Sequence, residues 1–99
     1  MESSDKKLQE QLCSVLASIN DPAQIAALLE DLCTCGEIEQ MAQRIECAKL
    51  LLEGNTYSKI IEDTEVSSAT LSRVSRCIQH GSGGYSRVLA RFFGIETYI

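Results

Sequence analysis

Tryptophan is absent from this 99-residue chain, proline occurs once, and only five residues are aromatic. So few aromatic and turn-forming residues argue against a β-sandwich. No apolar run approaches the roughly 18–20 residues that cross a bilayer. The first five residues are polar and acidic, whereas a signal peptide needs a basic start and an apolar stretch. We therefore expect a single cytoplasmic domain, 1–99, with no membrane partner.

Metal-site and catalytic patterns are also missing. The chain has one histidine, His80, and no Cys-x-x-Cys among its five cysteines. Zinc sites need four ligands at recognisable spacings, so reduced thiols are the expected state. No paired carboxylates, Ser-His-Asp set or glycine-rich phosphate loop suggests an enzyme. We expect no catalytic residue, no metal and no cofactor, and the role of the close pair Cys33 and Cys35 stays open.

Helical periodicity runs through the whole chain, with apolar residues recurring at steps of three and four. Capping signals separate the segments: Asp21 and Pro22 open the second, Thr34 and Glu37 form a capping box, and Gly54 ends the third. The last helix presents an apolar face that consists of Tyr85, Val88, Leu89 and Phe92. The sequence predicts an all-α fold of six helices, at about 6–19, 22–33, 36–53, 57–64, 68–80 and 85–93.

Charge is unevenly distributed along the chain. The net charge of −5 alone disfavours nucleic acid as a partner. From 67 to 95, however, there are four arginines and no acidic residue. Screening limits repulsion from distant acids, so a local basic surface can still attract phosphate. An ordinary solvated helix face is the alternative interpretation.

Residues 57–74 have the spacing of a helix-turn-helix: a short helix, a three-residue turn at 65–67 and a second helix. On the second helix, Leu71, Val74 and Ile78 share one face. We expect Ile60 and Val66 to join Leu71 and Val74 in the small core that fixes the angle between the two helices.

The opposite face of this second helix suits a DNA major groove. Small side chains let the backbone approach, hydroxyls reach base edges or phosphates, and arginines make bidentate contacts. Ser67 and Ser68 add backbone N–H groups at the helix start, where a phosphate oxygen binds favourably. Because helix-turn-helix folds also occur in proteins that bind only proteins, an interaction adaptor is the alternative. The outer face comprises Ala69, Ser72, Arg73, Arg76 and His80.

Residues 31–79 resemble the Trp repressor superfamily, and most closely its YerC/YecD group, which has a shorter turn before the recognition helix. The resemblance implies an intertwined homodimer. Segments 1–54 and 85–93 would form the shared core, and 55–80 the helix-turn-helix head. It implies a transcriptional repressor that reads a palindromic operator on double-stranded DNA. The matching stretches are Asp31-Leu32-Cys33-Thr34, Glu37-Ile38, Met41-Ala42-Gln43-Arg44-Ile45, Leu50-Leu51-Leu52-Glu53-Gly54 and Ala69-Thr70-Leu71-Ser72-Arg73-Val74.

Two residues of the head depart from the family pattern. Ile61 stands where alanine is usual, which predicts a slightly wider approach of the two helices. Glu65 stands where glycine is usual, and at that place it would need an uncommon left-handed conformation.

The resemblance also assigns contacts with DNA. Ser58 and Lys59 would face the DNA backbone, and Arg73 would meet phosphate. The residues implied to lie in or beside the groove are Ser68, Ala69, Thr70, Ser72 and Arg76.

The resemblance further implies a site for a small effector. In the Trp repressors two arginines and a threonine help to hold the amino-acid corepressor, and Thr34, Arg44 and Arg73 match those positions. Val74, however, replaces a glycine that borders the indole, and Cys77 replaces a serine that binds the amino group. L-Tryptophan is therefore one candidate effector, and another small molecule or no effector at all is the alternative.

Overall fold

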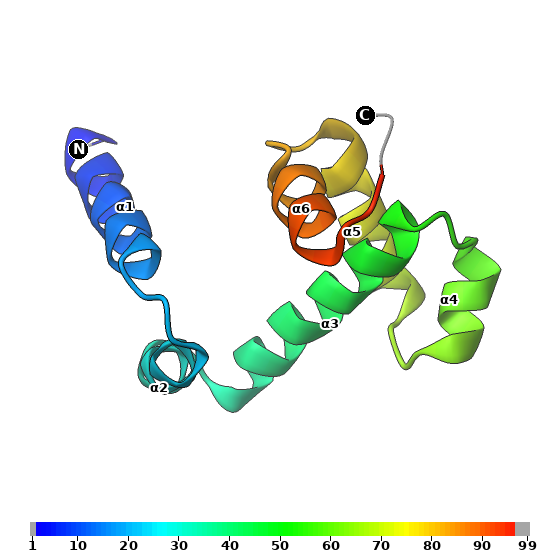
Figure 1. The fold of residues 1–99 in the computed structure, drawn as a ribbon, viewed down its shortest axis with the longest axis horizontal. Helices are drawn as coiled ribbons and strands as arrows, with labels where there is room; N and C mark the ends of the chain where they lie inside the picture. The colour runs from blue at the N-terminus through cyan, green and yellow to red at the C-terminus, as the bar shows by residue number, and fades with distance from the viewer. Residues whose placement is uncertain (1, 97–99) are drawn as a thin grey trace. The chain divides into compact units, whose positions relative to one another are not determined.

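The computed structural model describes residues 2–96, and all of its regular elements within that range are helices (Figure 1). The all-α prediction is confirmed. None of these helices combines the length and apolar character that a bilayer crossing requires. The elements are α1 (Glu2–Ala17), α2 (Pro22–Leu32), α3 (Cys35–Leu52), α4 (Tyr57–Asp63), α5 (Ser68–His80), a π-helical turn η1 (Tyr85–Leu89) and α6 (Ala90–Phe93).

The chain divides into two compact units, Met1–Ile38 and Glu39–Ile99. In the first unit, Asp21 caps α2 as predicted, since its carboxylate accepts a hydrogen bond from the Ala23 amide at 3.1 Å. Helix α1 ends two residues before the predicted position. The Ser18 hydroxyl donates to the Val15 carbonyl at 2.7 Å, and such a local bond competes with continuation of the helix.

The apolar stripes of the first unit are not buried within it. Leu8, at the exposed face of α1, has 63% of its surface accessible, and α2 has no buried residue. Among the described side chains at 4–38, none is fully buried. Helices α1 and α2 therefore do not form a hydrophobic core by themselves. The exposed stripe consists of Leu8, Leu12, Val15, Leu16 and Leu32.

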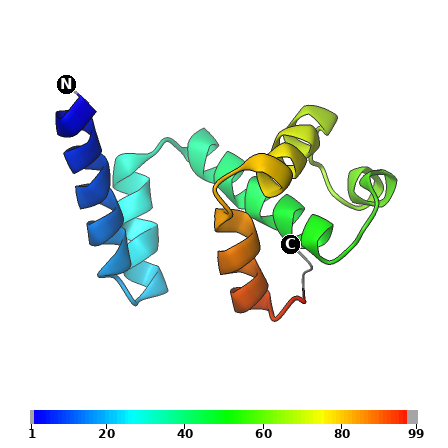
Figure 2. The same ribbon diagram turned by 90° about the horizontal axis from the view of Figure 1, so that it is seen from above.

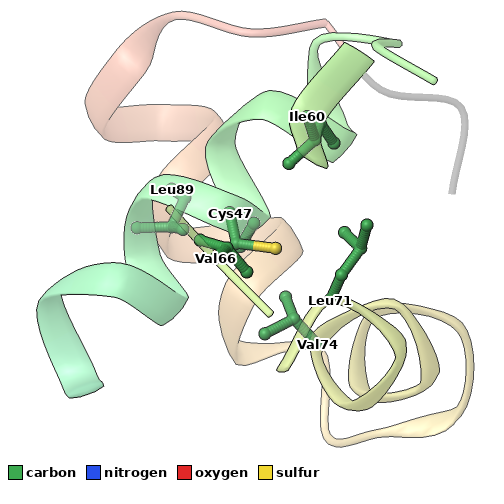
Figure 3. Packing of buried hydrophobic residues seen from close by; sticks show 7 residues of the cluster. Cys47, Ile60, Val66, Leu71, Val74 and Leu89 are labelled. Atoms are coloured by element: carbon green, nitrogen blue, oxygen red, sulfur yellow. The ribbon is translucent and has the colours of Figure 1, made fainter. Parts of the chain in front are cut away.

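The second unit contains the hydrophobic core of the chain. Side chains from α3, α4, the following turn, α5 and η1 converge there (Figure 3). The four residues predicted to fix the helix-turn-helix angle are all buried, so that prediction is confirmed. The core residues are Cys47, Ala48, Ile60, Val66, Leu71, Val74 and Leu89.

Helix α3 joins this core to the head and ends as predicted at Gly54. Gly54 has a φ of +95°, which a glycine adopts without steric cost. The Gly54 amide donates to the Leu51 carbonyl at 3.0 Å, and the Asn55 amide donates to the Leu50 carbonyl at 3.1 Å. The Leu50 and Leu51 carbonyls near the end of α3 are thereby satisfied, and the chain turns into α4.

The last helix differs from its prediction. Residues 85–93 form a continuous helical run (Figure 2), but its first turn, η1, is a π-helix. A π-turn is wider than an α-turn, so it rotates the residues after it relative to the expected face. Of the four residues predicted to form an apolar face, Leu89 is buried and Tyr85 half-buried, whereas Val88 and Phe92 are exposed, Phe92 with 78% of its surface accessible.

Candidate nucleic-acid interface

The head consists of α4, a turn and α5, and the turn is built around Thr64. Its hydroxyl donates to the Ile60 carbonyl at 2.7 Å and accepts a hydrogen bond from the Val66 amide at 3.2 Å. The Val66 side chain is buried in the core. These bonds hold the turn closed and direct the chain into α5.

The prediction of a left-handed Glu65 is wrong. Within residues 2–96, every residue with positive φ is a glycine. Thr64 is already extended, with φ −130° and ψ 173°, and its side chain supplies the hydrogen bonds of the turn. The direction of the chain therefore changes without a glycine.

Ser67 caps α5. Its hydroxyl accepts a hydrogen bond from the Thr70 amide at 3.1 Å and also lies 3.1 Å from the Thr70 hydroxyl. The amides of Ser68 and Ala69 precede the first hydrogen bond within the helix. Both residues are exposed, so these amides are available to an anion at the start of the helix.

Helix α5 has the two faces that its sequence predicts. Leu71 and Val74 are buried and Ile78 is half-buried, which fixes the helix on the core. The opposite face is open to solvent along its length. Its exposed residues are Ala69, Ser72, Arg73, Arg76 and His80.

The basic residues of the head differ in whether a carboxylate lies within ion-pair distance. Among the described residues, no carboxylate lies within ion-pair distance of Arg73 or Arg76. Lys59 instead forms an ion pair with Asp63, one turn along α4, at 2.9 Å. Both side chains of the pair are largely exposed, so this bond exchanges easily with solvent. The two arginines thus present uncompensated charge, while Lys59 does not.

Three of the predicted contact residues, Ser58, Ser68 and Ser72, line one hollow of about 530 Å³ between α4 and α5. Tyr57 and Glu62 border the same hollow but were not among the predicted contact residues. A periodicity signal existed for Tyr57, because it lies one turn before Ile61, which also borders the hollow.

The four residues matched to the effector site lie in different places. Arg44 and Arg73 line a hollow of about 290 Å³ between α3 and α5. Cys77 lines a separate hollow of about 530 Å³, bordered by Tyr85 and the loop 81–84. Thr34 belongs to the first unit, where its hydroxyl caps α3. Of these four residues, Arg44 and Arg73 are the two that line one hollow.

Tyr85 was predicted only as an apolar residue, yet its hydroxyl faces this region. Burial raises the pKa of Tyr85 above its ordinary value of 10.0, and the nearby Cys77 thiol raises it further. The guanidinium groups of Arg44 and Arg73 oppose this shift, so the phenol lies within electrostatic range of both arginines. Burial likewise raises the pKa of the Cys47 thiol.

Neither unit supplies a metal centre from residues that the structure describes. Among them, no three histidine, cysteine, aspartate or glutamate side chains come together as ligands. The polar groups that the outer face of α5 exposes are hydroxyls, backbone amides, arginines and His80.

Comparisons with known proteins agree with this architecture. The chain matches the model of the Trp repressor protein family over residues 7–92. It is 43% identical over 88 residues to YerC of Bacillus subtilis (strain 168), an uncharacterized protein, covering 89% of this chain and 85% of YerC.

Two crystal structures have the same fold. A proposed Trp repressor from Staphylococcus aureus has a TM-score of 0.84 and 33% identity, covering 93% of this chain and 91% of that chain. A TrpR-like protein from Eubacterium eligens ATCC 27750 has a TM-score of 0.82 and 41% identity, covering 92% and 94%. With six helical segments within residues 2–96, a helix-turn-helix head and these matches, the chain belongs to the Trp repressor protein family.

Proposed function

We propose that this protein is a transcriptional repressor that binds a specific palindromic operator through its helix-turn-helix head. Membership of the Trp repressor family supports a helix-turn-helix regulator. The observation that carries the proposal is the outer face of α5: it is exposed, and Arg73 and Arg76 have no carboxylate partner among the described residues. Uncompensated arginines on an exposed helix are suited to phosphate and guanine contacts.

The proposal gives each polar residue of the head a role. Arg73 and Arg76 contact phosphate or guanine from the middle of α5. Ser67 holds the start of α5 in place, and the amides that follow it bind a phosphate oxygen. Ser58 and Lys59 contact the DNA backbone from the first head helix. The remaining contacts are made beside the groove by small or hydroxyl-bearing side chains, namely Ser68, Ala69, Thr70 and Ser72.

The proposal includes a homodimer. The exposed apolar stripe of α1 and the exposed Phe92 near the other end of the chain are costly in water. A second copy of the chain would cover these surfaces and pair two heads about one helical turn, roughly 34 Å, apart on DNA. Sedimentation equilibrium should give twice the chain mass of 10.9 kDa. A chain that stays monomeric at the concentration at which it binds DNA contradicts this part of the proposal.

Selection from a randomised duplex library tests the main claim. We expect enrichment of a palindrome, and binding whose logarithm falls linearly with the logarithm of salt concentration. Substitution of Arg73 or Arg76 by glutamine should reduce the slope by about 1 per lost phosphate contact. Arg91→Gln removes the same charge from exposed α6 and should leave the slope unchanged. If no sequence is enriched at low salt, specific DNA binding is excluded.

The hollow between α4 and α5 favours a second candidate, a protein-interaction adaptor. Glu62 borders it and repels phosphate, while Tyr57 and Ile61 offer exposed apolar surface. A stoichiometric protein partner that protects Arg73 and Arg76 from modification would support the adaptor over the repressor.

We propose that operator binding does not require L-tryptophan. Val74, which stands where the Trp repressors have a glycine, is fully buried in the hydrophobic core and adds a branched side chain at that position. Any small effector would instead bind in the hollow that contains Arg44 and Arg73. The duplex selection should therefore give the same palindrome and affinity with and without L-tryptophan, and a strong dependence on L-tryptophan would contradict this proposal.

A further inference from the structure

Cys33 and Cys35 line the same hollow at the junction of α2 and α3. The hollow has a volume of about 460 Å³ and lies wholly within the first unit. Cys33 is half-buried, Cys35 is exposed, and both are free thiols. The other residues around it are Ala26, Leu29, Glu30 and Ile38.

The backbone explains why the two thiols share this hollow. Cys33 follows α2 in an extended conformation, with φ −124° and ψ 157°, and Thr34 is the capping residue before α3 begins at Cys35. A single residue separates the two cysteines, and both side chains border the same hollow. The capping box between Thr34 and Glu37 holds this short segment in place.

The ligand must be one that two sulfur atoms can bind. Thiolate sulfur is a soft ligand and binds soft metal and metalloid ions most strongly. Zinc needs about four ligands, and no cluster of three metal-binding side chains exists among the described residues. Trivalent arsenic with one organic substituent needs only two sulfur atoms, because its third bond is already made to carbon.

The remaining walls of the hollow fit such a ligand. Ala26, Leu29 and Ile38 provide an apolar surface for the organic substituent. The carboxylate of Glu30 disfavours an anion, and a trivalent organoarsenical oxide is neutral. We propose that Cys33 and Cys35 form a chelating site for a trivalent organoarsenical, with its organic group in this hollow.

Binding is a condensation without a change in oxidation state. Two As–S bonds replace the arsenic–oxygen bond and the two S–H bonds. The oxygen leaves as water with both thiol protons, and arsenic remains trivalent. No oxidant or reductant is consumed.

Titration of the reduced, full-length protein with phenylarsine oxide tests the site. One equivalent per chain should remove two reactive thiols, and mass mapping of the unaltered protein should place the bridge on the peptide that contains Cys33 and Cys35. Either Cys33→Ser or Cys35→Ser should weaken binding by about 100-fold or more, because one thiol cannot chelate. Cys13→Ser and Cys77→Ser remove single exposed thiols elsewhere and should leave the affinity unchanged.

Two results would overturn the proposal. A bridge mapped to other cysteines, or no stoichiometric binding to the unaltered protein, excludes the site, and neither result depends on how a variant folds. Inorganic arsenite should bind more weakly than phenylarsine oxide, since it has no group to bury in the hollow. Equal affinities would contradict the placement of the organic group in the hollow. The proposal is independent of DNA binding.

Discussion

Thr34 and Glu37 hydrogen-bond to each other's backbone amides at the start of α3. A carboxylate oxygen of Glu37 accepts from the Thr34 amide at 2.8 Å, and the Thr34 hydroxyl accepts from the Glu37 amide at 3.1 Å. The pair satisfies two amides that a helix start otherwise leaves to water. It fixes the beginning of α3, the longest helix that the structure describes.

Glu37→Ala should lower the free energy of unfolding by about 1 kcal/mol, because the Thr34 amide loses its acceptor. Glu37→Gln keeps an acceptor and should retain most of the stability. Urea denaturation followed by circular dichroism measures both. Glu39→Ala removes an exposed carboxylate two residues further along α3 and is the matched control. An equal loss in the two alanine variants would contradict the capping role.

Leu71→Ala should destabilise the protein by about 2–5 kcal/mol, since it opens a cavity where the recognition helix sits on the core. Ile61→Ala, in the same head but 41% exposed, should change stability by no more than about 0.5 kcal/mol. Thermal unfolding in parallel measures the difference. Similar losses in the two variants would mean that Leu71 does not anchor α5.

Stability should fall in alkaline solution. The pKa values of Cys47 and Tyr85 are raised in the folded chain, so folding favours their protonated forms. Their contribution to stability is complete below pH 9.0 for Cys47 and below pH 10.0 for Tyr85, and it is lost as the pH rises through the raised values. Urea midpoints at about pH 8 and about pH 11 measure the loss. Tyr85→Phe should lose less stability over this interval, and an unchanged loss would assign the effect to other groups.

Asp63→Asn should strengthen DNA binding, because it releases Lys59 from its ion pair and leaves the ammonium free for phosphate. The dependence on salt should steepen by up to about 1 in the logarithmic slope. In a Lys59→Gln background, Asp63→Asn should have little effect beyond the change in net charge. Gel-shift titrations over a salt series measure the slope for the unaltered protein, for each single variant and for the double variant. The same gain in both backgrounds would show that the ion pair is irrelevant to binding.

Most of the fold could be predicted because its signals are local. Asp21, Thr56 and Ser67 each cap a helix by a bond to an amide two or three residues ahead. The core of the head followed from the spacing of apolar residues on two helices. The first unit was less predictable. The stripe on α1 has the spacing of a buried face, but spacing does not say whether the covering surface comes from the same chain.

The exposed face of the candidate site could be predicted from the sequence, whereas the contacts between its side chains could not. The exposed face of α5 follows from helical periodicity alone. The ion pair of Lys59 requires a rotamer choice, and Tyr85 approaches Arg44 and Arg73 only through tertiary packing. Glu65 needs no left-handed conformation, because the Thr64 side chain closes the turn without the glycine that the family usually has there.

The π-turn at Tyr85–Leu89 has a consequence for how relatives of this chain vary in length. A π-turn arises when one residue is inserted into an α-helix, and the surrounding turns keep their packing. Homologues one residue shorter at this place should therefore have an uninterrupted α-helix. In an alignment the gap would fall between Tyr85 and Leu89, in the interior of a helix, where deletions are ordinarily rare.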